Sequence, residues 1–345
     1  MSSKLRDYIP ALKYGAKIYP EDMADGGGLP LSTGRVIFVD GDLSTGGAGG
    51  TWADAYATIQ AGINAAIAGD VILIAERTIG VYSTDPISYA ETLTIPVAKS
   101  QLSLVGVSRG LAQGGLPQIK IGAGAVAMLK IQSMGCLVAN LGINGASSTG
   151  GGILLDGDGS TKDASGTTIV GCHFKNCKGS TSKASSGGAI SWPANGDSWG
   201  VRIAGNRFYK NVAGINCLGT SNTVPQDVVI EDNTFSSSVN TEVDADIYFA
   251  GSGVKGILIR NNDFATVDVP TLASATIGRY ISLAAGSNGM VSGNRFACLA
   301  NESATEITFG AAGTGAIIPT TVRMCANYGE TGLDGTMESG EIFRT

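Results

Sequence analysis

The sequence is poor in the residues from which many catalytic and metal sites are made. It has a single histidine, His173, so a histidine cluster for a metal is excluded, and the spacing supplies no partners for a Ser/His/Asp site. Its six cysteines include no CxxC pair, and we interpret them as small buried hydrophobic residues rather than as disulfides or metal ligands. No cofactor is predicted.

Charge and long apolar runs are also scarce. Charged residues make up 15% of the chain, against about 25% in an ordinary domain, and the net charge is −6. This balance gives no positive field for nucleic acid or an anionic membrane, so neither is a predicted partner. No stretch reaches the roughly 18 continuous apolar residues of a membrane span, and the N-terminus lacks the layout of a secretory signal. The sequence predicts a soluble protein made in a cytoplasm.

What the chain does have is glycine and a repeated phrase. Glycine accounts for 51 of 345 residues without a Gly-x-y register, which excludes collagen and favours many tight turns. The phrase has two apolar residues at alternating positions, a turn with Asn, and then an aromatic residue. Its copies are VRIAGNRF ending at Phe208, VVIEDNTF at Phe235, ILIRNNDF at Phe264, MVSGNRF at Phe296 and, with a slip of one, VRMCANY at Tyr328; TIVGCHF at Phe174, LSLVGV near Val107 and LVANLGI near Ile143 are weaker copies.

The segments between the copies decide the kind of repeat. They show no 3.6-residue apolar spacing, which a helical repeat needs, but they contain a second strand each. These strands read AVAMLKI (125–131), GGILLD (151–156), GGAISW (187–192), AGINCL (213–218), ADIYFA (245–250), RYISLA (279–284), TEITFG (305–310) and GEIFRT (340–345). Short strands in every turn and no crossover helices predict an all-β parallel β-helix.

These repeats, together with the opening VIFVDGDLSTGGAGGTWADAYATIQAGINAAIAGDVILIAERTIGVY (36–82), resemble the right-handed parallel β-helix superfamily of pectate lyases and many phage spike and fibre proteins. The resemblance covers about residues 36–345 and is specific for fold rather than for function. It implies a solenoid in which residues 35–100 form a first strand, a capping helix and the first coil, and residues 101–345 form the remaining coils. Residues 1–34 are a separate arm.

The two ends of the solenoid carry different expectations. Apolar residues at helical steps predict a capping helix over 51–70, with Thr51 as its N-cap and Gly69 at its C-terminal stop. At the other end EIFRT reads as a last coil strand that no cap follows, so we expect another subunit or a larger assembly to cover it. A homotrimer is implied by the resemblance alone.

The arm is predicted to be ordered by another chain. Its apolar and aromatic residues are too few to offset its own chain entropy. The predicted attachment or oligomer contacts are Leu5, Tyr8, Ile9, Leu12 and Tyr14.

The asparagines of the repeated phrase allow a functional and a structural interpretation. A polar stripe could recognise sugars, but the regular spacing favours an internal ladder that fixes the turn. The ladder residues would be Asn206, Asn233, Asn262 and Asn294, beside a stack of Phe174, Phe208, Phe235, Phe264 and Phe296. Cys172 takes the Asn position in its copy, and His173 should point outward.

Two acidic clusters are candidate chemical sites. Asp156, Asp158 and Asp163 lie in DGDGSTKD, loosely like a calcium loop, although a solvated turn is the favoured interpretation. Gln226-Asp227, Asp246, Arg279 and Arg295 faintly resemble the pectin methylesterase pattern, in which such residues serve as acid, nucleophile and substrate clamp. The Gly-x-Tyr-x-Glu and Gly-Arg-Pro-Trp phrases of that family are absent, as are the short motifs of polygalacturonases and pectate lyases.

Trp192 and Trp199 flank the loop PANGDS, which could bind a ligand or touch another subunit; the alternative is a tryptophan pair that covers the flank of the coil.

Three classes of function compete. The sequence favours a non-enzymatic virion structural protein of a phage, a head decoration or a spike or fibre component, attached to capsid or tail proteins by its arm. The first alternative is a carbohydrate-active enzyme acting on acidic polysaccharide, and the second is an adhesin that binds a host-surface glycan.

Overall fold

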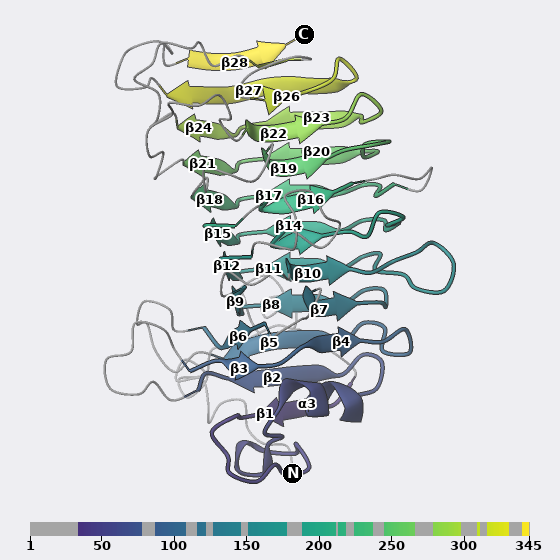
Figure 1. Cartoon of the computed structure of the whole chain (residues 1–345), viewed down its shortest axis with the longest axis vertical. Helices are drawn as coiled ribbons and strands as arrows, with labels where there is room; N and C mark the ends of the chain where they lie inside the picture. Colours follow the sequence, from purple (N-terminus) through teal and green to yellow (C-terminus); the bar gives the residue numbers. More distant parts are fainter. Residues whose placement is uncertain are drawn as a thin grey trace, which may run out of the picture.

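The computed structural model shows a right-handed parallel β-helix, in which short strands stack coil on coil along one axis (Figure 1). The structure describes residues 34–77, 87–107, 116–121, 127–145, 151–177, 188–211, 213–218, 224–236, 245–265, 279–297, 309–310, 316–330 and 340–344. The predicted fold class, an all-β right-handed parallel β-helix, is confirmed. The arm residues Leu5, Tyr8, Ile9, Leu12 and Tyr14 lie outside the described residues.

Each full coil contributes one strand to each of three parallel ladders. The first ladder contains β1 (Val36–Val39), β2 (Val71–Ala75), β5 (Ser103–Val107), β8 (Leu137–Ala139), β11 (Thr168–Val170), β14 (Arg202–Ala204), β17 (Val229–Glu231), β20 (Ile257–Arg260), β23 (Gly289–Ser292) and the start of β27 (Val322–Glu330). The second contains β3 (Tyr89–Ala90), β6 (Gln118–Lys120), β9 (Gly142–Asn144), β12 (His173–Lys175), β15 (Arg207–Tyr209), β18 (Thr234–Ser236), β21 (Asp263–Ala265), β24 (Arg295–Ala297) and the end of β27. From β8 and β9 onward a two-residue turn joins the first-ladder strand to the second-ladder strand of each coil, up to β23 and β24.

The third ladder contains β4 (Leu93–Ile95), β7 (Ala127–Ile131), β10 (Gly151–Leu155), β13 (Ile190–Ser191), β16 (Ile215–Cys217), β19 (Ala245–Phe249), β22 (Arg279–Leu283) and β26 (Ala316–Ile317), which β25 (Phe309–Gly310) also joins. The second strands predicted from the sequence therefore form this ladder, with the exception of GEIFRT.

The core fills the coil because alternate residues of every strand point inward. In the first ladder Ile169, Ile203, Ile230 and Ile259 are in register on successive coils, and all four are fully buried. Burying one such side chain contributes roughly 1.5–3 kcal/mol. A stack of identical aliphatic positions therefore contributes to the stability of every coil that carries it.

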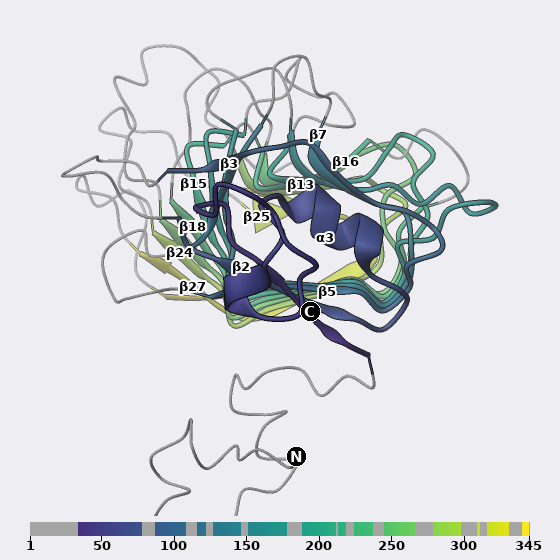
Figure 2. The same ribbon diagram turned by 90° about the horizontal axis from the view of Figure 1, so that it is seen from below.

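A short helix covers the N-terminal end of the coil. The helix α3 (Ile59–Ala65) buries Ile59 and Ile63 against the first coil, and in the view along the axis it lies across the coil (Figure 2). Its N-cap is Thr58, whose hydroxyl accepts a hydrogen bond from Ala61 N, and the Glu91 carboxylate accepts two more from the N–H groups of Ile59 and Gln60. Capping of this end is as predicted.

The predicted extent of the helix was wrong. Residues 51–70 do not form one helix, because the backbone is extended at Ala55, which follows a single 3₁₀ turn, η2 (Trp52–Asp54). Thr51 makes no side-chain cap bond, and Trp52 lies outside the helix with its ring edge-on to Phe38 at 4.8 Å. The prediction from helical spacing was wrong here because Tyr56 forms a parallel β-bridge with Val39 of β1, and a β-bridge requires an extended backbone at Tyr56.

The C-terminal end also differs from the prediction. EIFRT is not a coil strand: β28 (Gly340–Arg344) pairs antiparallel with β27, so the chain folds back over the last coil. The slip of one at Tyr328 also has a cause. Tyr328 is paired with Arg295 and is 53% exposed, while Gly329 takes the position of Phe296. The aromatic residue of this copy therefore points outward.

Candidate functional site

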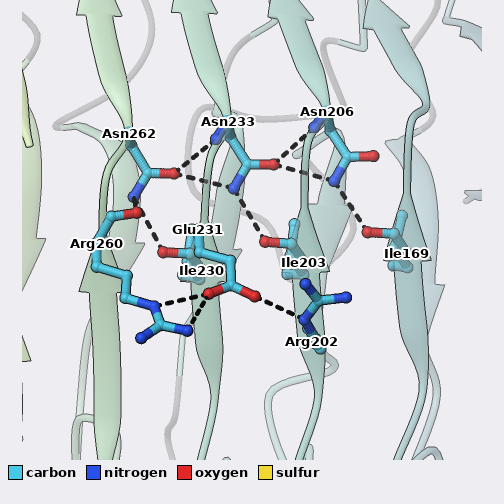
Figure 3. Close-up of polar contacts among 9 residues, drawn as sticks. All are labelled: Ile169, Arg202, Ile203, Asn206, Ile230, Glu231, Asn233, Arg260 and Asn262. Carbon is cyan, nitrogen blue, oxygen red and sulfur yellow. Dashed lines mark hydrogen bonds and ion pairs between the residues drawn. The ribbon is translucent and has the colours of Figure 1, made fainter. Parts of the chain in front are cut away.

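The inner corner between the first and second ladders holds the predicted asparagine ladder (Figure 3). Each Asn Oδ1 accepts hydrogen bonds from the backbone N–H and the Nδ2 of the Asn in the preceding coil, at 2.9–3.1 Å. Each Nδ2 also donates to a carbonyl of the preceding coil, as Asn233 does to Ile203. All these amides are buried, so they form scaffold and are not available to a ligand.

Sequence reasoning missed two members of this system. Asn327 continues the ladder by accepting from Asn294, and it was missed because the copies were aligned on their aromatic residues. Asn211 makes the same kind of contact just after the second ladder, where its Oδ1 accepts a hydrogen bond from the backbone N–H of Cys177. At the N-terminal end of the ladder Cys172 N donates to Asn206 Oδ1, and burial raises the pKa of the Cys172 thiol to about 12, so this thiol is not a nucleophile at neutral pH.

The phenylalanines stack beside the asparagines. From Phe174 to Phe296 successive ring centroids are 4.6–5.0 Å apart with interplanar angles of 4–11°. Every ring of the stack is buried. The repeated phrase therefore fixes the shape of the coil, and any site has to lie outside it.

The residues that resemble the pectin methylesterase pattern do not meet. Asp246 lies near the start of β19, whereas Asp227 N donates to Lys255 O, in the connection beyond the far end of that strand. Arg279 is paired with Ala245 next to Asp246, but its side chain lies outside the described residues. Arg295 is engaged by Asp263 at 3.1 Å. This arrangement does not place an acid, a nucleophile and an arginine around one substrate atom.

Asp246 nevertheless has an unusual environment. Part of the residue reaches the surface, but desolvation raises the pKa of its carboxyl to about 8. The neighbouring register position holds Gly214, where a Cβ would come within 2.7 Å of the Phe235 ring.

Four successive connections between the third and first ladders enclose a cleft of about 520 Å³, called here the connection cleft. Its lining residues are Val97, Ser100, Gln132, Ser133, Met134, Gly159, Ser160, Thr161, Lys162, Asp163, Ser165, Asp197 and Trp199. They follow β4, β7, β10 and β13 in turn, so the stacking of coils brings together residues up to about a hundred positions apart.

The acidic loop DGDGSTKD forms one wall of the cleft through its own contacts. Asp158 accepts hydrogen bonds from the N–H groups of Ser160, Thr161 and Lys162, and these bonds hold the pKa of its carboxyl below its usual range. Asp156 accepts from Gln132 Nε2 at 2.7 Å and pairs with Lys162 at 3.2 Å. The loop is therefore held in shape by contacts of its own side chains.

The calcium alternative finds no geometric support in this loop. The Asp163 carboxylate accepts from Ser165 N at 2.8 Å, so each of the three carboxylates serves a separate contact. Within the part of the chain that the structure describes, no three acidic, histidine or cysteine residues converge on a point where a metal could sit. The interpretation of the loop as a turn is the one that these contacts fit.

A second carboxyl group in the cleft is less well satisfied. Burial and the negative charge of Asp163 raise the pKa of the Asp197 carboxyl. The Oδ1 atom of Asp197 is buried and has no hydrogen-bond partner in the described chain. The sequence did not point to Asp197, because Asp197 and Asp163 belong to different coils and come close together only when the coils stack.

The two tryptophans have different environments. Trp192 is fully buried, its ring lies 5.5 Å from Phe249, and its Nε1 donates to Ser198 Oγ, so its indole packs in the coil and offers no surface to a ligand. Trp199 is 59% exposed, while its backbone is fixed by a hydrogen bond from its N–H to Ser165 Oγ at 2.8 Å. Val97 and Met134 add exposed apolar surface to the same cleft.

Comparisons with known proteins give similarity of fold only. No family model matches the sequence, and no curated protein is significantly similar to it. Among solved structures, the chain is similar to Escherichia coli YbhC (13% identity, TM-score 0.47, 98% of this chain and 95% of that one) and to a pectin methylesterase from Aspergillus niger (12%, 0.45, 90% and 92%). It is also similar to the pectate lyase Pel9A (11%, 0.36, 91% and 90%). Function is therefore argued from the residues of this chain. Among the described residues no helix has the length and apolarity to cross a membrane.

Proposed function

We propose that this protein binds carbohydrate, without turning it over, and that the connection cleft is the binding site. The observation that carries the proposal is Trp199, an exposed indole with a fixed backbone in the same cleft as the carboxyl groups of Asp163 and Asp197. An indole offers a flat apolar face to the C–H side of a sugar ring, and carboxylates accept hydrogen bonds from sugar hydroxyls. Clefts that combine apolar surface with a few placed polar groups are typical ligand sites.

The cleft also explains why the ligand would be a chain rather than a single small molecule. Its walls come from four successive connections that stack along the axis of the solenoid. A sugar polymer lying along that axis would contact more than one of them. The Ser100 and Ser165 side chains provide further hydroxyl groups for such a ligand.

The test is binding to a glycan array, followed by titration of any hit with matched variants. Trp199→Ala is expected to weaken binding about tenfold or more, which corresponds to about 1.4 kcal/mol. Trp52→Ala is the control, because Trp52 is another exposed tryptophan but lies at the N-terminal end, away from the cleft. An equal loss of affinity in both variants, or an array without a hit, contradicts the proposal. Release of a reaction product from the bound glycan would show that the protein is an enzyme, and would contradict binding without turnover.

A second proposal is the virion component predicted from the sequence, assembled as a homo-oligomer. It is supported by a separate apolar cluster formed by Val71, Leu73, Val105 and Ala139 with Phe38, Val107, Leu137 and Val170. These residues alternate with the core residues of the first ladder, so they lie on its outer face. Val71, Leu73, Val105 and Ala139 are almost fully buried, so the partly buried members of the cluster are the part of this face on which another protein can pack.

Sedimentation equilibrium tests this second proposal. Leu137→Lys is expected to convert an oligomer to monomer, while Ile67→Lys, at an apolar residue 60% exposed outside the cluster, should leave assembly unchanged. A wild-type monomer at high concentration would argue against assembly through this face.

A further inference from the structure

The connection cleft holds two carboxyl groups that belong to different coils. Asp163 follows β10 and Asp197 follows β13, and both residues line the cleft. The Asp163 carboxylate accepts a hydrogen bond from Ser165 N at 2.8 Å, and the Ser165 hydroxyl accepts one from Trp199 N at 2.8 Å. A chain of short contacts therefore ties one of the two carboxyl groups to the backbone of the exposed tryptophan.

The acidic loop packs closely against the second carboxyl group. At Gly159, where φ is +69°, a Cβ atom would come within 3.1 Å of Asp197 Oδ2. At Gly157 a Cβ atom would come within 2.3 Å of the Asp197 carbonyl oxygen. Glycine tolerates both the positive φ and the close approach because it has no Cβ. The two glycines of DGDG thus let the loop that carries Asp163 reach the side chain of Asp197.

The charges that surround Asp197 leave its carboxylate without compensation. Burial and the negative charge of Asp163 both raise the pKa of Asp197. Among the described residues that line the cleft, Lys162 carries the single positive charge, and its ammonium is paired with Asp156 at 3.2 Å. The half-buried side chain of Asp197 also has one buried oxygen, Oδ1, without a hydrogen-bond partner in the described chain. A cationic ligand would offset this excess of negative charge.

The arrangement fits an ammonium group better than a divalent metal ion. Calcium takes roughly six to eight oxygen ligands, and two carboxyl groups do not supply them. An ammonium group needs no closed shell of ligands, because its N–H groups donate separately to carboxylate oxygens in strong, charge-assisted hydrogen bonds. An indole beside it adds a cation–π attraction. The cleft offers both kinds of partner, since Trp199 lines it together with Asp163 and Asp197.

We infer that the connection cleft selects glycans whose sugars carry a free amino group, with the ammonium held by Asp163 and Asp197 and a sugar ring lying on Trp199. This inference rests on the proposed function and names the class of glycan that it takes. Glycans that carry carboxylate or sulfate groups are disfavoured, because like charges brought together in a cleft repel each other. In a polymer of amino sugars every unit carries the recognised group, so such a chain can bind along the axis in more than one register.

Titration calorimetry of the full chain at mildly acidic pH, where sugar amines are protonated, tests the inference with two probes. These are an oligomer of glucosamine and the fully N-acetylated oligomer of the same length, which lacks the charge. The protein is expected to bind the glucosamine oligomer about tenfold more tightly or better. Asp163→Asn and Asp197→Asn should each lose about tenfold in affinity for that oligomer alone, and the loss should shrink as salt rises.

Asp232→Asn is the matched control for these variants. Asp232 is exposed in the turn between β17 and β18, outside the cleft lining, and its φ of +55° is one that Asn adopts as well. Its affinity for the glucosamine oligomer should equal that of the wild type. The melting temperature of Asp197→Asn should be unchanged or slightly higher, since the variant removes one of two neighbouring carboxyl groups. The comparison of the two oligomers on the wild-type protein needs no variant.

Four results would overturn the inference. These are equal affinity for the two oligomers, unchanged affinity in both Asp163→Asn and Asp197→Asn, an equal loss in Asp232→Asn, and binding of an oligolysine of the same charge as tight as that of the glucosamine oligomer. The last result would assign the cleft to a basic peptide. A neutral or acidic glycan that binds through Trp199 would overturn this inference and leave the proposed function standing, whereas a protein that binds no glycan would overturn both.

Discussion

The corner between the first and second ladders and the connection cleft are built by the same coils but obey different rules. In the corner the same two residue types recur in register, with amide contacts of 2.9–3.1 Å and ring spacings of 4.6–5.0 Å. In the cleft every connection contributes different residues, each fixed by local contacts such as those of Asp158. The periodic part stabilises the coil, and the aperiodic part is free to acquire a ligand.

The largest expected effect is a loss of stability in the corner. Phe235→Ala removes a fully buried ring that stacks on Phe208 at 4.6 Å and on Phe264 at 4.8 Å. We expect it to lower the free energy of unfolding by about 3–5 kcal/mol. Trp199→Ala, in the cleft, should change it by no more than about 0.5 kcal/mol. Urea denaturation measures both, and equal losses would contradict the division between corner and cleft.

A second effect of slightly smaller size concerns the amide ladder. Asn233→Leu leaves Asn206 N–H, Asn206 Nδ2 and the Ile203 carbonyl without their partner in a buried site. Because an unsatisfied buried polar group costs about 1–3 kcal/mol, we expect a loss of about 2–4 kcal/mol. Hydrogen exchange should show the increased opening in the coils next to residue 233, since a solenoid transmits stability between neighbouring repeats.

Cys172→Ala is the control for the ladder. The bond from the Cys172 backbone N–H to Asn206 Oδ1 does not depend on its side chain, so this variant should lose only about 1 kcal/mol. A loss as large as that of Asn233→Leu would show that packing, rather than the amide bonds, sets the stability of the corner.

This division also separates what sequence could predict from what it could not. The Asn and Phe positions recur about every 30 residues, so the parallel coil, the ladder and the aromatic stack follow from the chain alone. The predictions for the two ends of the solenoid were wrong because the ends depart from the repeat. The extended chain at Ala55 and the antiparallel pairing of β28 are set by tertiary contacts. Asp163 and Asp197 come together only through coil stacking, which no local pattern encodes.

Trp192 and Trp199 show the same limit at the level of single residues. Both flank the loop PANGDS, and composition alone assigned them together. The structure separates them because Trp192 follows β13 into the core, whereas Trp199 precedes β14 and is anchored by Ser165 of the preceding coil. Ser165, whose hydroxyl accepts the hydrogen bond from the backbone N–H of Trp199, lies 34 positions away in the sequence.

A smaller effect, which depends on pH, is expected at Asp246 in β19. The pKa of Asp246 is raised to about 8 in the folded state from its ordinary value of 3.8, so the folded protein favours the protonated carboxyl. Stability from this group is complete below pH 4 and is lost as pH rises towards and through 8. Asp246→Asn should remove this fall and make the protein more stable than wild type at pH 8. The measurement is the melting temperature of variant and wild type at a series of pH values between 4 and 8. A constant difference between the two proteins over this range would contradict the raised pKa of Asp246.

The smallest expected effect on stability is in the cleft, where a substitution should instead loosen one wall. Asp158→Ala removes an exposed carboxylate that holds the N–H groups of residues 160–162 but touches no core residue. Global stability should change little, because this carboxylate contacts only its own loop. The amides of residues 160–162 should exchange faster, and affinity for a glycan bound in the cleft should fall, since the variant must order this wall on binding. Retained affinity together with faster exchange would show that the ligand does not use this wall, and would confine the site to the side of Trp199 and Met134.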